Sequence, residues 1–333
     1  MNHRRVFRRY PVRAILLVLV AAVPLIAEEH SPVEGAIPAP PNPTTYELRY
    51  KLATGDVLRY EVTHRASIRS TIDETTQAAQ TRTDSVKVWK VTDVLPNGEM
   101  EVMNVVERVH MVNQLPDREP TEYDSQRDKT PPPGYEDAAR AIGVPLSVLR
   151  IAPNGKVLRR QVKTQKLSVE EDSAVVVRLP DKPVTVGETW DDPFEVKVTL
   201  ESGGTKRIQT RRHHQLADVT NGIATIEVKY QILSPIDAHI ESQLVQRLMD
   251  GEVKFDIDAG RVVGQQMDID KRILGFAGPT SSMHYVVRME EKLVDAEPKV
   301  TVRTPASSPP RNNRSYRSSS RQRAPQRTRG YRR

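Results

Sequence analysis

Four turn motifs divide the middle of the chain into β-hairpins. Three contain the dipeptide Asn-Gly, at residues 97–98, 154–155 and 221–222, and the fourth is Ala259-Gly260. Asn-Gly supplies the positive φ angles that tight hairpin turns need, so these residues serve backbone geometry and receive no binding role. The pattern predicts a chain rich in antiparallel sheet.

The segment before the fourth turn has the periodicity of a half-buried strand. Val253, Phe255 and Ile257 fall on one face, whereas Lys254 and Asp256 fall on the other. A sheet with one apolar face needs a cover on that face. Each sheet could therefore curl around a helix, or two sheets could pack together, and the sequence leaves both arrangements open.

The same features recur in the same order, which predicts an internal duplication. Each half opens with a glycine–acid pair, Gly55-Asp56 or Gly187-Glu188, and continues with a hairpin, VTDVLPNGEMEV at 91–102 or LADVTNGIATIEV at 216–228. A helix and a second hairpin follow in each half. We expect a mainly β fold, with minor α+β character, made of two related antiparallel units of roughly five or six strands and one short helix each.

The remaining elements complete this order. The helix candidates run from Tyr135 to Ile142 and from Ile236 to Met249, where apolar residues recur at helical spacing. The other segments are the closing hairpins at 149–158 and 255–263, the strands near 264–274 and 283–294, and an extra polar loop near 114–134.

Both ends of the chain are basic, whereas the body is acidic. Residues 1–27 carry five arginines and no acid, and residues 302–333 carry ten arginines and neither acid nor lysine. The total net charge of +7 therefore hides a net charge of −8 over residues 28–301. This asymmetry predicts different roles for the ends and the body.

The amino-terminal segment resembles a secretory signal. A basic stretch, Met1 to Arg13, precedes the 14-residue apolar run Ala14 to Ala27, which is shorter than the about 20 residues that span a bilayer. We expect cleavage after Ala27, with an uncleaved anchor as the alternative. Either reading places the body outside the cytoplasm, in the periplasm or the extracellular space, with membrane or envelope association left open.

The carboxy-terminal segment has the composition of a disordered tail, because it has too few aliphatic residues to fold. Arginine interleaved with serine and tyrosine favours contact with a polyanion. For an exported protein, an anionic envelope polymer or a membrane surface is a better partner than nucleic acid. The alternative is a solubilising tail without a partner. The polyanion-contact candidates are Arg311, Arg314, Arg317, Arg321, Arg323, Arg327, Arg329, Arg332 and Arg333.

These observations give five segments. They are a signal peptide at 1–27, a proline-rich linker at 28–45, a first β-rich unit at 46–178, a second β-rich unit at 179–298 and a disordered arginine-rich tail at 299–333.

The sequence offers no motif for catalysis. It has no cysteine, which excludes disulfides, thiolate metal sites, cysteine nucleophiles and acylation at a lipobox. The phosphate-binding, dinucleotide-binding, nucleophile-elbow and HExxH motifs are all missing. We therefore assign no catalytic residue, no metal site and no cofactor, and the sequence does not identify ligand-binding residues.

Histidines and aspartates are the remaining chemical candidates. His213-His214 is suggestive, but neighbours in a strand point to opposite faces and cannot chelate one metal together. Two aspartates at i and i+2 could hold calcium or act as an acid–base pair, yet their alternation with apolar residues favours a solvated face. Trp190 could line a ligand site, or lie in the core or at its rim. The other groups concerned are Asp191-Asp192, Asp256 with Asp258, Asp268 with Asp270, and the scattered His3, His30, His64, His110, His239 and His284.

Two segments carry a family resemblance. LPDKPVTVGETW at 179–190 and the strand start GDVLRY at 55–60 resemble signatures of an uncharacterised family of bacterial secreted β-rich proteins. The resemblance would cover about residues 45–295 and implies export and a β-rich fold. It supplies no catalytic residues, because the family has no established activity.

Three functions remain open. The first is an exported, non-catalytic binding or envelope-associated protein. The second is a carrier that encloses an apolar ligand, which requires aliphatic residues around a hollow that they do not fill. The third is a hydrolase, which requires two carboxylates buried together, one of them with a raised pKa. The absence of catalytic motifs favours the non-catalytic readings.

Overall fold

The computed structural model describes residues 44–163 and 176–297. The predicted signal peptide, nearly all of the linker and the tail with its nine candidate arginines lie outside these ranges. Among the described residues, no helix is long and apolar enough to span a membrane.

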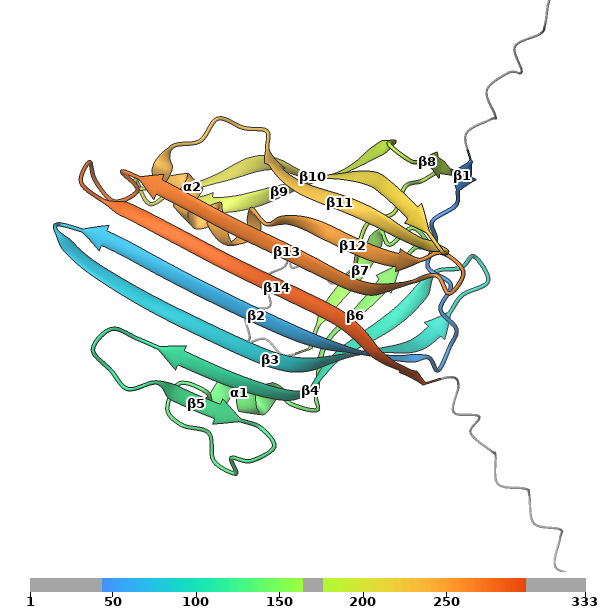
Figure 1. Cartoon of the computed structure of the whole chain (residues 1–333), viewed down its shortest axis with the longest axis horizontal. Coiled ribbons are helices and arrows are strands. Elements are labelled where there is room, and N and C mark those ends of the chain that lie inside the picture. The colour runs from blue at the N-terminus through green and yellow to red at the C-terminus, as the bar shows by residue number, and fades with distance from the viewer. Residues whose placement is uncertain (1–43, 164–175, 298–333) are drawn as a thin grey trace, which may run out of the picture. The chain divides into compact units, whose positions relative to one another are not determined.

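The described chain is mainly β, as predicted, and one antiparallel sheet contains twelve of its strands (Figure 1). The strand order is β7-β6-β4-β3-β2-β14-β13-β12-β11-β10-β9, with β5 paired to β4, and a separate small sheet joins β1 to β8. The first-half strands are β1 (Thr45–Tyr46), β2 (Val57–Ile72), β3 (Thr75–Val94), β4 (Met100–Gln114), β5 (Thr121–Asp124), β6 (Pro145–Ile151) and β7 (Val157–Val162). The second-half strands are β8 (Val184–Thr185), β9 (Thr189–Thr199), β10 (Thr205–Thr220), β11 (Ile223–Ile232), β12 (Asp250–Asp256), β13 (Arg261–Leu274) and β14 (Ser282–Glu297).

The helices lie where the sequence predicts them, but they are shorter. The first, α1, spans Glu136–Ala141, and the second, α2, spans Ala238–Leu244 and continues as the 3₁₀ turn η1, Val245–Arg247. The side chain of Asp237 caps α2 by accepting a hydrogen bond from the Ile240 N–H at 2.8 Å.

All four predicted hairpins form, although only one has the expected turn geometry. Both residues of Asn221-Gly222 have positive φ angles, 52° and 77°. In the turns at 97–98 and 154–155 only the glycine does. There the asparagine Oδ1 accepts the backbone N–H two residues ahead, at 3.2 Å and 3.1 Å. An asparagine in such an Asx turn does not need the left-handed conformation.

The two halves begin with the same backbone contacts. Gly55 N–H donates to Val91 O at 2.9 Å, and Gly187 N–H donates to Leu216 O at 2.7 Å. Val91 N–H and Leu216 N–H return the bond to the acidic residue after each glycine, at 2.9 Å and 3.0 Å. In both halves a bulge follows directly, between Val91 and Asp93 and between Leu216 and Asp218.

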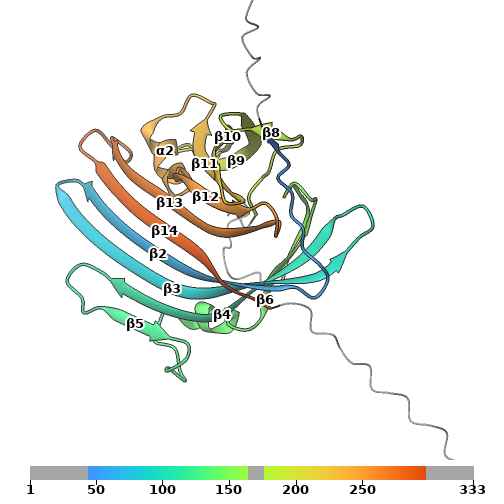
Figure 2. The same cartoon turned by 45° about the vertical axis from the view of Figure 1, so that its right-hand side comes forward.

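The sheet is strongly curved. Helix α2 touches both β9 and β13, which are separated by three strands in the sheet. Gln243 exchanges hydrogen bonds of 3.0 Å and 2.7 Å with the backbone of Thr199 on β9, and Glu241 pairs with Lys271 of β13 at 2.9 Å. One short helix can reach both strands only if the sheet curls around it. Figures 1 and 2 show α2 in the hollow of the sheet.

The largest apolar cluster takes side chains from both halves. Leu58 and Trp89 pack in it with Leu216, Ile226 and Phe255, all buried. A second cluster holds α2 against β9 and β10, and a third packs η1 against β13 and β14. Between these clusters the side chains of residues 44–163 and 176–297 leave a cavity on the concave face, which is the candidate site.

Candidate functional site

A cavity of about 330 Å³ lies under the concave face of the sheet. Strands from both halves line it, from β4 and β6 at one side of the sheet to β9 and β10 at the other. η1 and the segment 176–178 complete the lining. A volume of this size is at the lower end of the range of small-molecule sites.

The wall of the cavity is largely apolar and includes flexible side chains. Three methionines come from β13, from β14 and from the turn after η1, and unbranched thioethers adapt to irregular partners. The apolar lining residues are Val105, Val106, Leu146, Val176, Val177, Phe194, Val228, Met249, Val253, Met267 and Met289.

A buried ion pair bridges β3 and β14 inside the cavity. Lys87 Nζ lies 2.7 Å from Glu291 Oε2, although β2 separates their strands. Gln265 Nε2 donates to the same carboxylate oxygen at 2.9 Å, and the Lys87 ammonium lies 5.8 Å from the centroid of the Tyr60 ring. The side chain of Glu291 is only 5% exposed, so its charge depends on these partners.

A second polar group lies on β9 and β10. Arg212 Nη1 donates to Asp192 Oδ2 at 3.2 Å, and its guanidinium lies 4.3 Å from the centroid of the Phe194 ring. Phe194 meets Tyr230 edge-on with centroids 5.6 Å apart. An arginine held both by a carboxylate and by an aromatic face has a fixed orientation.

His214 lines the cavity next to Arg212 on the same strand face. It is buried, and its imidazole stacks on the indole of Trp190. Burial, helped by the nearby positive charge of Arg212, lowers the pKa of His214 to about 4. The side chain is therefore neutral at neutral pH. Within the described ranges, its Nδ1 has no hydrogen-bond partner.

Asn104 is a further buried polar residue in the lining. Its Nδ2 lies 3.5 Å from Ser147 Oγ, and among the described residues its Oδ1 has no hydrogen-bond partner. A buried acceptor without a partner costs roughly 1–3 kcal/mol. The wall thus presents an acceptor that a ligand donor would satisfy.

The structure separates the two adjacent histidines, as strand geometry predicts. His214 faces the cavity, whereas His213 lies on the outer face and pairs with Asp191 at 2.7 Å. Trp190 lies at the rim: its indole N–H donates to Arg178 O at 2.8 Å, and it does not itself line the cavity.

The aspartate pairs do not form chelating sites. Asp268 pairs with Arg288 at 2.6 Å, and Asp270 pairs with His284 at 2.7 Å. Asp256 Oδ1 accepts the Ala259 N–H at 2.8 Å and so shapes the hairpin turn. Across residues 44–163 and 176–297, no group of three or more potential ligands is placed to hold a metal ion.

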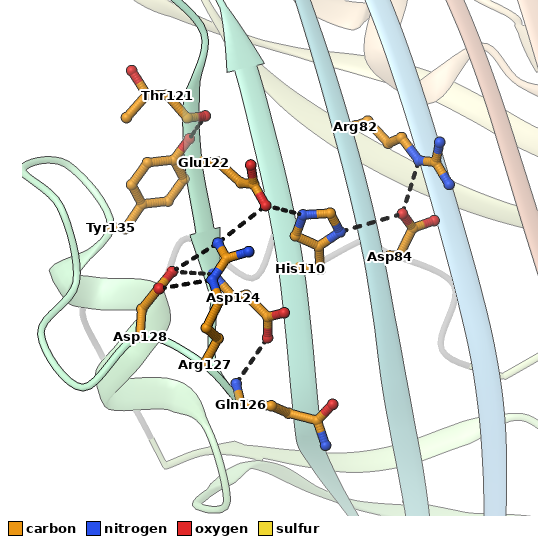
Figure 3. Close-up of polar contacts among 10 residues, drawn as sticks. All are labelled: Arg82, Asp84, His110, Thr121, Glu122, Asp124, Gln126, Arg127, Asp128 and Tyr135. Carbon is orange, nitrogen blue, oxygen red and sulfur yellow. Dashed lines mark hydrogen bonds and ion pairs between the residues drawn. The ribbon is translucent and has the colours of Figure 1, made fainter.

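A charged cluster lies on the outer face of β3, β4 and β5 (Figure 3). His110 lies between Glu122, at 2.9 Å, and Asp84, at 3.9 Å. Burial alone would raise the pKa of Asp84, but hydrogen bonds from Arg82 and Thr63 lower it below its ordinary value.

The same cluster lacks the features of an acid–base pair. Hydrogen bonds from His110 and Arg127 lower the pKa of the exposed Glu122. Both carboxyls are thus stabilised as anions, and neither is suited to hold a proton near neutral pH. The hydrolase hypothesis required a raised pKa, which this cluster does not provide.

The sequence singled out the lining residues His214 and Asp192 only as possible metal or acid–base groups and assigned no residue to a ligand site, although β14 contains a readable signal. Tyr285, Val287, Met289, Glu291 and Leu293 share one face of that strand. A single carboxylate in an otherwise apolar row indicates a buried partner. Its partner, Lys87, lies 204 residues away in the sequence, so no local pattern could identify it.

Comparisons with known proteins give little support for any particular function of this chain. No protein-family model matches the chain, and no curated protein does either. A structure described as showing lipid–protein interactions in lipovitellin aligns with 78% of this chain at 13% identity and a TM-score of 0.41. This chain covers only 27% of that one. A DUF1329 family protein from Desulfovibrio piger aligns at 9% identity over 75% of this chain and 88% of its own, with a TM-score of 0.12. Neither similarity is close enough to support an argument.

Proposed function

We propose that this chain is a non-catalytic carrier that encloses an apolar ligand under its curved sheet. The observation that carries the proposal is the cavity of about 330 Å³ with eleven apolar residues in its lining. Apolar walls around unfilled space lose dispersion contacts and gain nothing from water, so an apolar occupant stabilises them.

The composition of the wall supports a carrier over an enzyme. The lining residues Lys87 and Glu291 form an ion pair, Asp192 pairs with Arg212, and His214 is stacked on Trp190. Methionines on β13, on β14 and after η1 allow the wall to adapt to ligands of different shape. The signal-like residues 1–27 agree with export to a compartment in which apolar molecules must cross water.

The repeated architecture is part of the same proposal. We infer that the two β-rich units, 46–178 and 179–298, arose by duplication. The support is that β2-β3-β4-α1-β6-β7 and β9-β10-β11-α2-β12-β13 follow the same order once β5, β8 and β14 are set aside, together with the matching hydrogen bonds of Gly55 and Gly187. Joining two such units edge to edge at β2 and β14 gives a sheet wide enough to curl around a ligand.

The first experiment is denaturing extraction of natively purified protein, followed by mass spectrometry of small molecules. We expect a stoichiometric apolar compound. A matched pair of variants then locates it: Met289→Trp fills the cavity from β14, whereas Glu290→Trp places the same ring on the exposed outer face.

The two variants give opposite expectations. Met289→Trp should lose the bound compound while keeping the circular dichroism spectrum of the unmodified protein, and Glu290→Trp should keep both. Equal retention of the compound by the two variants would contradict a site in the cavity. Absence of any compound, together with no uptake of an added fatty acid or fatty alcohol, would favour the surface-binding function instead.

A further inference from the structure

Two uncharged polar side chains lie next to each other in the cavity wall. Asn104 of β4 and Ser147 of β6 are paired across their strands, and both line the cavity. Their exposed fractions are only 5% and 2%, so solvent reaches little of either side chain. Their neighbours along the chain, Val105 and Leu146, also belong to the lining. The two residues therefore form a small polar spot in an apolar wall.

The hydrogen-bonding capacity of this polar spot is not exhausted. Asn104 Nδ2 lies 3.5 Å from Ser147 Oγ, at the limit of a hydrogen bond. Within residues 44–163 and 176–297, Asn104 Oδ1 has no hydrogen-bond partner. Ser147 Oγ is the acceptor in the contact with Asn104, which leaves the hydroxyl proton to be donated elsewhere. The pair can therefore accept one hydrogen bond from a ligand and donate another.

A hydroxyl group complements this pair in either orientation of the amide. In the orientation described, a ligand O–H donates to Asn104 Oδ1, and the ligand oxygen accepts from the Ser147 hydroxyl. In the opposite orientation, Nδ2 donates to the ligand oxygen, and Ser147 Oγ accepts the ligand proton. An ether or carbonyl oxygen supplies no donor, and an aliphatic group satisfies neither residue.

The absence of charge on these two side chains favours an uncharged ligand group at this spot. A carboxylate or an ammonium placed here would lose its hydration without gaining a counterion from Asn104 or Ser147. In the same wall, Lys87 and Glu291 bind each other at 2.7 Å. A neutral hydroxyl costs less to bury than an ion and satisfies the open acceptor of Asn104.

We propose that the ligand is an uncharged amphiphile whose hydroxyl group hydrogen-bonds to Asn104 and Ser147, while its apolar part lies against the aliphatic and methionine lining. This inference rests on the proposed carrier function. In the empty protein the buried acceptor of Asn104 is destabilising, and a ligand hydroxyl removes that cost.

The test is displacement of the uncharged fluorophore N-phenylnaphthylamine from the stripped full-length protein. The competitors are decan-1-ol, undecane and methyl nonyl ether, which have the same number of non-hydrogen atoms. Each competitor is compared between the unmodified protein and Asn104→Leu with Ser147→Ala, because the cost of dehydrating the competitor is then the same on both sides. We expect decan-1-ol to lose about tenfold in affinity, undecane to lose nothing, and the ether to lose less than the alcohol.

A matched double variant controls for the substitutions themselves. Asn113→Leu with Thr121→Val removes an amide and a hydroxyl from a paired position on β4 and β5, outside the lining. It should leave the affinities of all three competitors unchanged. Should the variant of Asn104 and Ser147 fail to fold, Ser147→Ala alone replaces it. That variant should bind decan-1-ol about threefold more weakly and undecane as before.

The outcomes distinguish this inference from the carrier function. Equal changes in the affinities for decan-1-ol and undecane would overturn recognition of a hydroxyl while leaving an apolar site in place. A loss for the ether as large as that for the alcohol would overturn it in favour of a ligand oxygen that only accepts. Weaker binding of the alcohol by the Asn113 and Thr121 variant would also overturn it. If neither the fluorophore nor any competitor binds, the carrier function itself is wrong.

Discussion

The imidazole of His214 lies parallel to the indole of Trp190, with ring centroids 5.4 Å apart and an angle of 5° between their planes. The two residues are directly paired on β10 and β9. The stack places an aromatic wall at the rim of the cavity and keeps His214 away from water. The positive charge of the neighbouring Arg212 opposes protonation of the imidazole. The stability of the folded protein should therefore depend on pH through His214.

Replacing His214 with Gln should flatten the dependence of stability on pH. The pKa of His214 is about 4 in the folded protein and about 6.5 when unfolded. Between these values only the unfolded chain binds the proton. The free energy of unfolding should therefore fall by up to about 1.4 kcal/mol per pH unit as pH decreases through this window.

Urea unfolding at several values between pH 7.5 and pH 4 measures this slope. His214→Gln should remove most of the slope above about pH 5. The partly buried His64, whose pKa is also lowered by burial, and at lower pH the carboxyls of Asp84 and Glu122, whose pKa values are lowered, account for a remainder. The control is Thr210→Val on the same strand face, which deletes a 2.7 Å hydrogen bond to Phe194 O. It should reduce stability equally at every pH. A His214→Gln slope equal to that of the unmodified protein would show that His214 is not buried as described.

Breaking the Lys87–Glu291 pair should destabilise the protein more when one partner is removed than when both are. Lys87→Met leaves the buried carboxylate of Glu291 with Gln265 alone, which should cost about 3 kcal/mol or more. Lys87→Met with Glu291→Gln should recover at least half of that loss, because no buried charge remains. Chemical denaturation near pH 7 provides both values.

An exposed ion pair is the comparison for this prediction. Asp268 and Arg288 are 2.6 Å apart, but their side chains are 38% and 55% exposed. Asp268→Asn should therefore cost less than about 1 kcal/mol. If Lys87→Met is no more costly than Asp268→Asn, the cavity is filled with water and Glu291 is solvated there.

The sequence predicts the parts of this fold that depend on neighbours along the chain. The hairpins at Gly98, Gly155, Gly222 and Gly260 are local, since each depends on a turn and the alternation beside it. The helix positions follow from the same kind of pattern. Asn97 does not have the positive φ angle that the Asn-Gly pattern predicts. Its side-chain oxygen accepts a backbone hydrogen bond in the turn, and the sequence pattern does not account for that bond.

The cavity depends on contacts that no local pattern contains. The pairing of β14 with β2 joins the end of the chain to its beginning and brings Glu291 opposite Val62. Curvature then brings Arg212 and Asn104, from strands with six others between them in the sheet, into one lining. Alternation along a strand indicates which residues are inside, but not how far the sheet bends. The volume left unfilled is therefore a property of the whole sheet.

Gly155→Ala should be strongly destabilising and should also weaken ligand binding. Gly155 has a φ angle of 75°, and a Cβ there would lie 2.3 Å from Val177 O and 2.9 Å from the Tyr50 ring. Left-handed strain and overpacking together should cost about 3 kcal/mol or more. Since Val177 lines the cavity, its displacement should reduce the affinity for the apolar ligand.

Gly203→Ala is the matched control, because Gly203 has a φ angle of 84° and a Cβ would meet nothing within 4 Å. It should cost only about 1–2 kcal/mol and leave ligand binding unchanged. Thermal unfolding and titration with the same ligand measure both effects. Similar losses of stability and of ligand affinity in the two variants would mean that segment 176–178 is not in close contact with the Gly155 turn.

Deleting residues 302–333 should remove surface attachment without affecting the fold. The deleted segment carries ten arginines and no acid, whereas residues 28–301 carry a net charge of −8. Retention on an anionic matrix at low salt should therefore disappear, and Tm should stay unchanged. Replacing the ten arginines with glutamine is the control, because it keeps the length of the segment and removes only its charge. Unchanged retention in the glutamine variant would exclude electrostatic attachment, and a lower Tm after deletion would show that the segment packs on the body and that its predicted disorder is wrong.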